Sequence, residues 1–345
     1  MQHVFLMCSE RSGSNLITRL MDAHPAICGP APSHLIRILA QNAVRYGDPT
    51  DDQQWERLLK DASAILETKL GDWVTDWDTN RLRREVRTRS LGSLVRTVVE
   101  SEAKANGAST VFIKENHLAD YLPFVQHAFH GTKIVAMVRD PRDMALSWKN
   151  SPVLRGDVVR ATRIWQNDQR QLLEVLGQLR IDRDIMLITY EDLVSDTAGV
   201  LADTCSFLGL DPDPAMLSFH DHAATAQMAQ KSDTWKNLRQ PVMTNNFNKW
   251  REGLDADEIT YVEHVCGDTM RAFGYEPEMP PHADPAALEH QLTAHERHEK
   301  PAYADVPQPE LVMRRRREEV VARIASHPLV PRHGFGTDEP HRALA

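Results

Sequence analysis

Short runs of apolar residues alternate along this chain with longer segments in which apolar residues recur every three or four positions. A continuous apolar run is typical of a strand buried on both faces, whereas the longer period is typical of a helix. The pattern predicts strands at His3–Cys8, Thr110–Lys114, Lys133–Val138 and Asp184–Tyr190. Because helices are predicted between these strands, we expect an α/β fold with a central, mostly parallel sheet flanked by helices.

Helical periodicity accounts for much of the remaining chain. Between the first two predicted strands, residues 46–106 are interpreted as a mainly helical insertion. Further helices are predicted at Leu16–Met21, Tyr121–Phe129, Pro141–Trp148, Asp157–Leu179, Thr197–Leu208 and Ala256–Phe273. Ala26–Ile38 is expected to be a loop that turns into a helix near His34, and Thr225–Glu252 is expected to be irregular.

The chain is expected to divide at residue 275. Residues 1–275 hold all the predicted strands, whereas residues 276–345 are rich in proline and charged residues and indicate a linker or wrapping arm. This arm contains one predicted helix, Pro309–Ser326. Its arginine run, Arg314–Arg317, is interpreted as a solvated helix face, and a contact with a partner or a second copy of the chain is the alternative.

Composition narrows the class of protein. The 345 residues have a formal net charge of −9, so broad electrostatic binding to nucleic acid is not expected. The four cysteines form no CxxC pair, which argues against a zinc site or a disulfide framework. Because no apolar stretch approaches the length of a membrane span or a signal-peptide core, we expect a cytoplasmic protein.

Candidate chemistry appears first in the turn after the first predicted strand, Ser9–Asn15. A strand that feeds a helix through such a turn aims several backbone N–H groups at one point, where the positive end of the helix dipole also lies. Arg11 and the hydroxyl groups of Ser12 and Ser14 add donors. The turn is interpreted as a binding loop for a phosphate or a similar anion, with an ordinary strand–helix connection as the alternative.

A second group of polar residues lies at the end of the third predicted strand. Arg139 follows this strand, and Ser147 lies in the next predicted helix, one face of which can turn back toward the strand end. An arginine at the end of a buried strand is costly without a partner. Arg139 and Ser147 can together bind a phosphate, since the planar guanidinium group donates two parallel hydrogen bonds. The alternative is a turn held by ion pairs within Arg139–Arg142.

Together the two stretches resemble the sulfotransferase family that uses 3′-phosphoadenosine-5′-phosphosulfate (PAPS). Ser9–Leu16 resembles the 5′-phosphosulfate loop of that family, and Val138–Ser147 resembles its 3′-phosphate motif. Weaker matches follow in the family's order at Asp22–Pro25, Tyr190–Leu193, Phe207–Leu210 and Asn248–Leu254. The resemblance covers roughly residues 1–275 and implies a sulfotransferase domain with a fold like that of the P-loop nucleotide-binding proteins.

The resemblance implies how the reactants are bound. PAPS would be the sulfuryl donor, adenosine 3′,5′-bisphosphate would be the product, and no metal would be required. The residues implied for donor binding are Arg11, Ser12, Gly13, Ser14, Asn15, Arg139, Ser147, Tyr190, Lys249, Trp250 and Arg251. The acceptor would be a hydroxyl or amine of a carbohydrate, a lipid or a small natural product. The helical insertion and Thr225–Arg251 would shape its pocket.

The general base is the main departure from the family pattern. Some relatives carry a catalytic glutamate after the glycine that follows a His-Pro pair, but Gly29 is followed here by Pro30–His34 without a carboxylate. Phe112–Leu118 resembles the segment that ends in a catalytic histidine in the small-molecule enzymes. His117 is therefore expected to take the acceptor proton, helped by Lys114 and Arg11. The alternative bases are His34 and Glu115.

Two alternative functions follow from these departures. A P-loop nucleotide kinase or hydrolase would need the Gly-Lys-Ser/Thr that the first loop lacks. A sulfotransferase-like protein without catalytic activity, which only binds a ligand, is the other alternative, because the glutamate of the relatives is absent.

Overall fold

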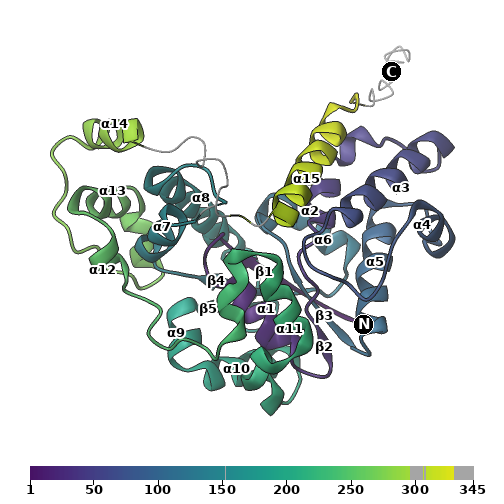
Figure 1. Ribbon diagram of the computed structural model, residues 1–345, viewed down its shortest axis with the longest axis horizontal. Coiled ribbons are helices and arrows are strands. Elements are labelled where there is room, and N and C mark those ends of the chain that lie inside the picture. The colour runs from purple at the N-terminus through teal and green to yellow at the C-terminus, as the bar shows by residue number, and fades with distance from the viewer. Residues whose placement is uncertain (152, 296–305, 307, 330–345) are drawn as a thin grey trace, which may run out of the picture.

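The computed structural model describes residues 1–151, 153–295, 306 and 308–329. A five-stranded sheet lies at its centre, with the strand order β2-β3-β1-β4-β5 and all neighbouring strands parallel (Figure 1). The strands are β1 Gln2–Cys8, β2 Ile27–Cys28, β3 Thr110–Lys114, β4 Lys133–Val138 and β5 Ile185–Thr189. The predicted parallel α/β fold is confirmed. The sequence pattern does not predict β2, because two residues are too few to show a period.

The side chains of β1 alternate between two cores. Val4 and Leu6 pack on one face of the sheet, and Phe5 and Met7 pack on the other. The helices that contribute to the Val4 core are α1 Ser14–Asp22, α9 Tyr190–Ser195, α10 Thr197–Leu208 and α11 Ala223–Lys231. The helices that contribute to the Phe5 core include α5 Leu91–Ala105, α6 Leu122–Ala128, α7 Pro141–Lys149, α8 Val158–Leu176 and α13 Ala256–Ala272.

The chain reverses its direction of strand addition at β1. From β1 it crosses to β2 and β3 on one side of the sheet, and β4 and β5 then lie on the other side. The loops that follow β1 and β4 therefore emerge side by side at the carboxyl edge of the sheet. Open parallel sheets bind their ligands at such a switch point.

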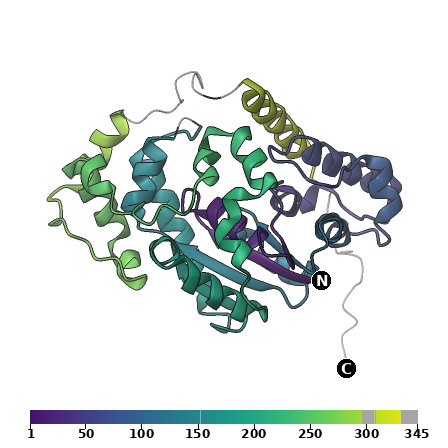
Figure 2. The same ribbon diagram turned by 60° about the horizontal axis from the view of Figure 1, so that its bottom comes forward.

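The remaining helices form two peripheral groups. The insertion holds α3 Asp52–Glu67, α4 Thr79–Glu85 and α5, and it is preceded by α2 Leu35–Gln41. Beyond the sheet lie α12 Trp250–Gly253, α14 Pro285–His295 and α15 Gln308–Ser326. In both views α14 lies beside α13, whereas α15 lies beside α3, and contacts between residues of each pair agree (Figures 1 and 2).

Two predicted irregular segments contain helices. Ala223–Lys231 forms α11, so the irregular interpretation of Thr225–Glu252 is wrong for its first part. Pro285–His295 forms α14 within the predicted arm, where Leu288 is buried against Val159 and Tyr261. Apolar anchoring by a few residues explains why the helical period is weak there. Residues 296–305 and 330–345 of the arm lie outside the described part of the chain.

Short connections carry 3-10 helices at η1 Ala43–Arg45, η2 Leu118–Tyr121, η3 Pro214–Asp221 and η4 Asp233–Arg239. Among the described residues, no helix combines the length and apolar character that crossing a membrane requires.

Candidate active site

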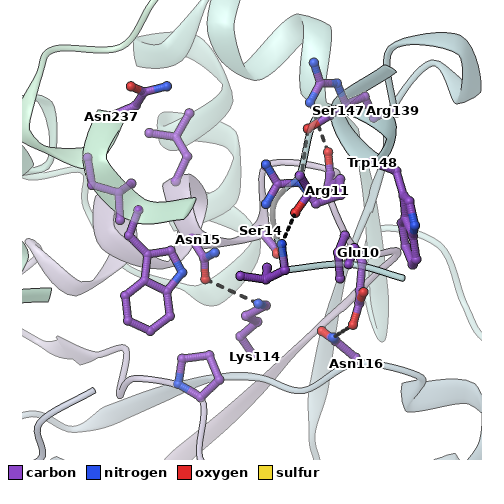
Figure 3. A pocket seen from close by; sticks show the side chains of 18 of the residues that line it. Glu10, Arg11, Ser14, Asn15, Lys114, Asn116, Arg139, Ser147, Trp148 and Asn237 are labelled. Atoms are coloured by element: carbon purple, nitrogen blue, oxygen red, sulfur yellow. Dashed lines mark hydrogen bonds between the residues drawn. The ribbon is translucent and has the colours of Figure 1, made fainter. Parts of the chain in front are cut away.

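A cavity of about 840 Å³ opens at the carboxyl edge of the sheet. Its walls come from the loops after β1, β3 and β4 and from η4 (Figure 3). The segment that follows η4 and the helix α15 complete them. The predicted site residues that line it are Arg11, Gly13, Ser14, Asn15, His34, Lys114, His117, Arg139, Ser147, Tyr190 and Lys249. The structure thus brings together residues predicted from segments that are far apart in the sequence.

The loop between β1 and α1 is held in an unusual backbone conformation. Arg11 has φ 63° and Gly13 has φ 91°, both in the left-handed region. A Cβ atom on Gly13 would lie 2.4 Å from the Tyr190 ring, so only glycine fits there. Helix α1 begins at Ser14, and its first N–H groups therefore face the cavity edge where Ser14 and Asn15 lie.

Direct hydrogen bonds join the two predicted phosphate loops. Arg11 Nε donates to Ser147 Oγ at 3.0 Å, and Arg139 Nη1 donates to the Arg11 carbonyl oxygen at 3.0 Å (Figure 3). The helix that carries Ser147 is aligned by Asp140, which accepts from the Arg142 N–H at 2.8 Å as the N-cap of α7. The loops after β1 and β4 thus form one surface.

Arg139 is buried beneath this surface. Its guanidinium carbon lies 4.2 Å from the centre of the Tyr190 ring, and its Nη2 donates to the Asn246 carbonyl oxygen at 3.3 Å. Tyr190 Oη in turn accepts from Asn246 Nδ2 at 2.6 Å. The Nε atom of Arg139 is buried and has no hydrogen-bond partner. An unpartnered buried N–H of this kind fits a site that receives an anionic ligand.

Positive charge dominates this part of the cavity. Within the described part of the chain, Arg11, Lys114 and Arg139 have no carboxylate within ion-pair distance, although Lys114 Nζ donates to Asn15 Oδ1 at 3.3 Å. Burial, followed by the nearby Arg139 charge, lowers the pKa of Arg11. Burial also lowers the pKa of Lys114. An anion that enters the site would therefore stabilise the charged form of each of these three side chains.

His117 is paired with a carboxylate that the sequence analysis did not identify. His117 has φ 57°, lines the cavity, and places Nδ1 3.7 Å from Asp168 Oδ1. Asp168 Oδ2 accepts from Ser9 Oγ at 2.8 Å, and Ser9 Oγ accepts from Gln169 Nε2 at 2.8 Å. Interaction with Asp168 raises the pKa of His117, against the opposing effect of burial.

The two alternative bases have different surroundings. His34 lines the cavity, and its Nδ1 atom is buried without a hydrogen-bond partner. Burial, with nearby cations, holds the pKa of His34 well below its ordinary value, so the imidazole is neutral. Glu115 is buried and does not line the cavity, because its carboxylate accepts from the N–H groups of Ile36 at 3.3 Å and Arg37 at 3.0 Å.

Three of the predicted donor residues lie away from the cavity wall. The Ser12 hydroxyl donates to the Ser9 carbonyl oxygen at 2.6 Å, which supports the loop from behind. Trp250 is buried, and the guanidinium carbons of Arg142 and Arg251 lie 4.0 and 4.3 Å from its ring centre. Of the three predicted residues Lys249, Trp250 and Arg251, only Lys249 lines the cavity.

The structure also adds residues that the sequence reasoning missed. Arg317 lines the cavity and donates to Thr68 Oγ1 at 2.8 Å, so the solvated-face interpretation of the arginine run is wrong for it. Arg315 and Arg316 are exposed, as that interpretation predicts. Arg317 lies seven residues before buried Ile324, a spacing that places both on one helix face. No sequence pattern of this kind points to Asp168, because Asp168 and His117 lie in separate elements and no helical spacing relates them.

Within the described ranges, no group of three or more His, Cys, Asp or Glu side chains is arranged to hold a metal ion. His220 and His222 therefore have no ligating partners that would form such a group.

Comparisons with known proteins match this chain to sulfotransferases. A model described as the sulfotransferase family matches residues 3–214. A Caenorhabditis briggsae protein provisionally named a protein-tyrosine sulfotransferase is 19% identical over 80% of this chain and 89% of its own length. The sulfotransferase domain of the Synechococcus PCC 7002 olefin synthase superimposes with a TM-score of 0.58 at 18% identity, covering 81% of this chain and 96% of that domain. The sulfotransferase domain from the curacin biosynthetic pathway gives 0.47 at 16% identity, covering 87% and 99%.

Proposed function

This chain belongs to the sulfotransferase family, and from that membership we propose that it transfers a sulfuryl group from PAPS to a hydroxyl group of an acceptor. The observation that carries the proposal is the joined pair of loops, in which Arg11, Ser147 and Arg139 meet and the buried Arg139 Nε has no partner. PAPS carries two separate anionic groups, a 5′-phosphosulfate and a 3′-phosphate. A surface with two basic loops at one sheet edge suits such a ligand.

The loop after β1 would bind the 5′-phosphosulfate. Its N–H groups at the start of α1 and the Arg11 guanidinium provide donors, and no carboxylate of the described residues lies within ion-pair distance of Arg11. Arg139 and Ser147, with Lys249 at the cavity rim, would bind the 3′-phosphate. Lys114, whose Nζ donates to Asn15 Oδ1 of this loop, would hold the sulfuryl oxygens. These fixed charges stabilise negative charge that develops on the leaving phosphate.

His117 would act as the general base. If Nδ1–H faces Asp168, the unprotonated Nε2 can take the acceptor proton. PAPS supplies the sulfuryl group and a phosphate leaving group: the bond from sulfur to the 5′-phosphate oxygen breaks as the bond to the acceptor oxygen forms. Asp168, held by Ser9, would be a positioning residue that sets the tautomer of His117 and stabilises its protonated form.

Ligand-induced stabilisation tests the donor site. Adenosine 3′,5′-bisphosphate at 100 times its dissociation constant should stabilise the protein by about 2.7 kcal/mol. The proposal expects a rise in Tm with this ligand that Arg139→Ala removes. A rise in Tm with ATP and Mg²⁺ but not with the bisphosphate would contradict the proposal and would favour a nucleotide kinase.

Transfer of radioactive sulfate from labelled PAPS into a cell extract tests the enzyme. The proposal expects incorporation by the wild type that His117→Ala reduces by roughly 100-fold or more. His130→Ala is the matched control, because His130 is exposed and distant from the cavity lining. Bisphosphate binding without any transfer would favour an inactive binding protein.

A further inference from the structure

Two cations near the proposed reaction centre take no part in the proposed donor site. Arg317 on α15 and Arg37 on α2 are both half-buried, and Arg317 lines the cavity. The guanidinium of Arg317 donates to three oxygens on α3 and in the adjoining loops: Thr68 Oγ1 at 2.8 Å, Ser33 O at 2.6 Å and Ile65 O at 3.1 Å. These are neutral acceptors, so they fix the position of the guanidinium without compensating its charge.

The charges around Arg317 do not balance. In the part of the chain that the structure describes, neither Arg317 nor Arg37 has a carboxylate within ion-pair distance. Glu115 is near enough to affect Arg317, but its oxygens accept from backbone N–H groups, and burial raises its pKa to about 7. Two cations therefore face one carboxyl group that is only partly ionised at neutral pH. A buried excess of positive charge is costly without an anion.

Two buried polar atoms without hydrogen-bond partners belong to residues of the same region as Arg317. Arg37 Nε and His34 Nδ1 are buried and have no hydrogen-bond partners, and His34 lines the cavity. The charges of Arg37, Arg317, Lys114 and His117 all act on His34. His34 therefore lies near both the cation on α15 and the residues proposed for transfer.

We propose that the acceptor carries an anionic group, a carboxylate or a phosphate, and that Arg317 and His34 bind this group while the acceptor hydroxyl lies toward His117. This inference rests on the proposed function and names the chemical class of its acceptor. Arg314, the other arginine of α15 in the cavity wall, is compensated by Glu310, with Nε and Nη2 at 2.8 and 2.6 Å from Glu310 Oε1. Glu318 of α15 also lines the cavity, but no ion pair joins it to Arg317 in the described part of the chain, so Arg317 is the α15 cation proposed to meet an anionic acceptor.

Of the two residues proposed for this subsite, His34 lies within the matched family region and Arg317 lies beyond it. Arg317 lies outside residues 3–214, and it reaches the cavity because α15 packs on α3 of the insertion. The donor site uses other side chains, namely Arg11, Arg139 and Ser147. A change at Arg317 should therefore alter acceptor binding and leave donor binding unchanged.

Binding of matched probes to the protein saturated with adenosine 3′,5′-bisphosphate tests the inference without requiring turnover. The carboxylate arm compares 4-hydroxybenzoate with its methyl ester, and the phosphate arm compares glycerol 3-phosphate with glycerol. The anionic member of at least one pair should bind about tenfold tighter or more, the range expected for a hydrogen bond to a charged group. Arg317→Gln should remove most of this preference, and Arg317→Lys should keep part of it.

Arg316→Gln is the matched control, since Arg316 is exposed on the same helix. Equal binding of charged and uncharged probes in both arms, or an equal loss of preference in Arg316→Gln, would overturn the inference. Should Arg317→Gln fail to fold, the preference of the wild type and of Arg317→Lys decides the question. Failure of the bisphosphate itself to bind is a different result, because it contradicts the proposed function.

Discussion

Arg11 Nε and Ser147 Oγ are hydrogen-bonded at 3.0 Å, although 136 residues separate them in the sequence. The bond joins the loop after β1 to the helix after β4, and Arg139 Nη1 adds a second link at the Arg11 carbonyl oxygen. In a site for a donor with two anionic groups, this arrangement makes the two binding loops depend on each other.

The first prediction concerns Ser147. Ser147→Ala should weaken binding of adenosine 3′,5′-bisphosphate by about tenfold or more, because a hydrogen bond to a charged phosphate contributes about 1.5–3 kcal/mol. Binding of adenosine 5′-monophosphate, which lacks the 3′-phosphate, should weaken less, because it loses only the link between Ser147 and Arg11. Isothermal titration calorimetry with both nucleotides measures the difference. Ser206→Ala, at an exposed serine of α10, is the control; an equal effect on both nucleotides would argue against a 3′-phosphate contact.

The second prediction concerns the pH dependence of transfer. Asp168 raises the pKa of His117 above 6.5, so the imidazole stays protonated to a higher pH than an ordinary histidine. Only the neutral imidazole accepts a proton, so kcat/KM should rise with pH through a midpoint above 6.5.

Asp168→Asn should move that midpoint to lower pH, because burial and the Arg37 charge then act on His117 without the carboxylate. The maximal rate should fall as well, since the amide does not stabilise the protonated imidazole. Asp203→Asn, at an exposed position of α10, should leave the profile unchanged. An unchanged midpoint in Asp168→Asn would show that His117 is not the group that titrates.

The third prediction concerns Gly13. Gly13→Ala should abolish bisphosphate binding and lower Tm, because its Cβ would meet the Tyr190 ring at 2.4 Å in addition to the strain of φ 91°. Gly107→Ala is a matched control, since Gly107 has φ 71° with no atom within 4 Å of the added Cβ. It should cost only the backbone strain, about 1–2 kcal/mol. Equal losses of Tm would mean that the Tyr190 contact is not restrictive.

The fourth prediction concerns the ion-pair network that supports α7. Arg142 Nη2 lies 2.7 Å from Asp140 Oδ2 and its Nη1 lies 2.6 Å from Glu263 Oε1, with all three side chains almost fully buried. Arg142→Ala leaves two buried carboxylates without their cation, which should cost about 3–5 kcal/mol.

Arg251→Ala is the matched control for this network. Both guanidinium groups lie over the Trp250 ring, but Arg251 is half exposed and pairs with the exposed Glu278. Its loss should cost less than about 1 kcal/mol. Urea denaturation of both variants measures the difference, and similar values would show that the buried network contributes little beyond packing on Trp250.

Patterns within short stretches of the sequence were enough to predict the fold and the two donor-binding loops. The apolar runs predict four of the five strands because burial on both faces leaves a continuous signal within a few residues. Arg11 and Arg139 each follow a predicted strand, and because the carboxyl ends of parallel strands meet at one edge, Arg139 Nη1 reaches the Arg11 carbonyl oxygen. The helices α11 and α14 were missed because few of their residues are buried, and β2 because it is too short.

The sequence by itself determined which segments become strands, which loops follow them, and hence where anion-binding side chains lie. Only the tertiary structure decided that Asp168 faces His117, that Glu115 and Trp250 are directed away from the cavity, and that Arg317 reaches Thr68 across 249 residues. The physical reason is the distance along the sequence over which each kind of interaction acts. Strand and helix periods arise from neighbouring residues, whereas these contacts depend on how separate helices pack, and no period along the chain records that packing.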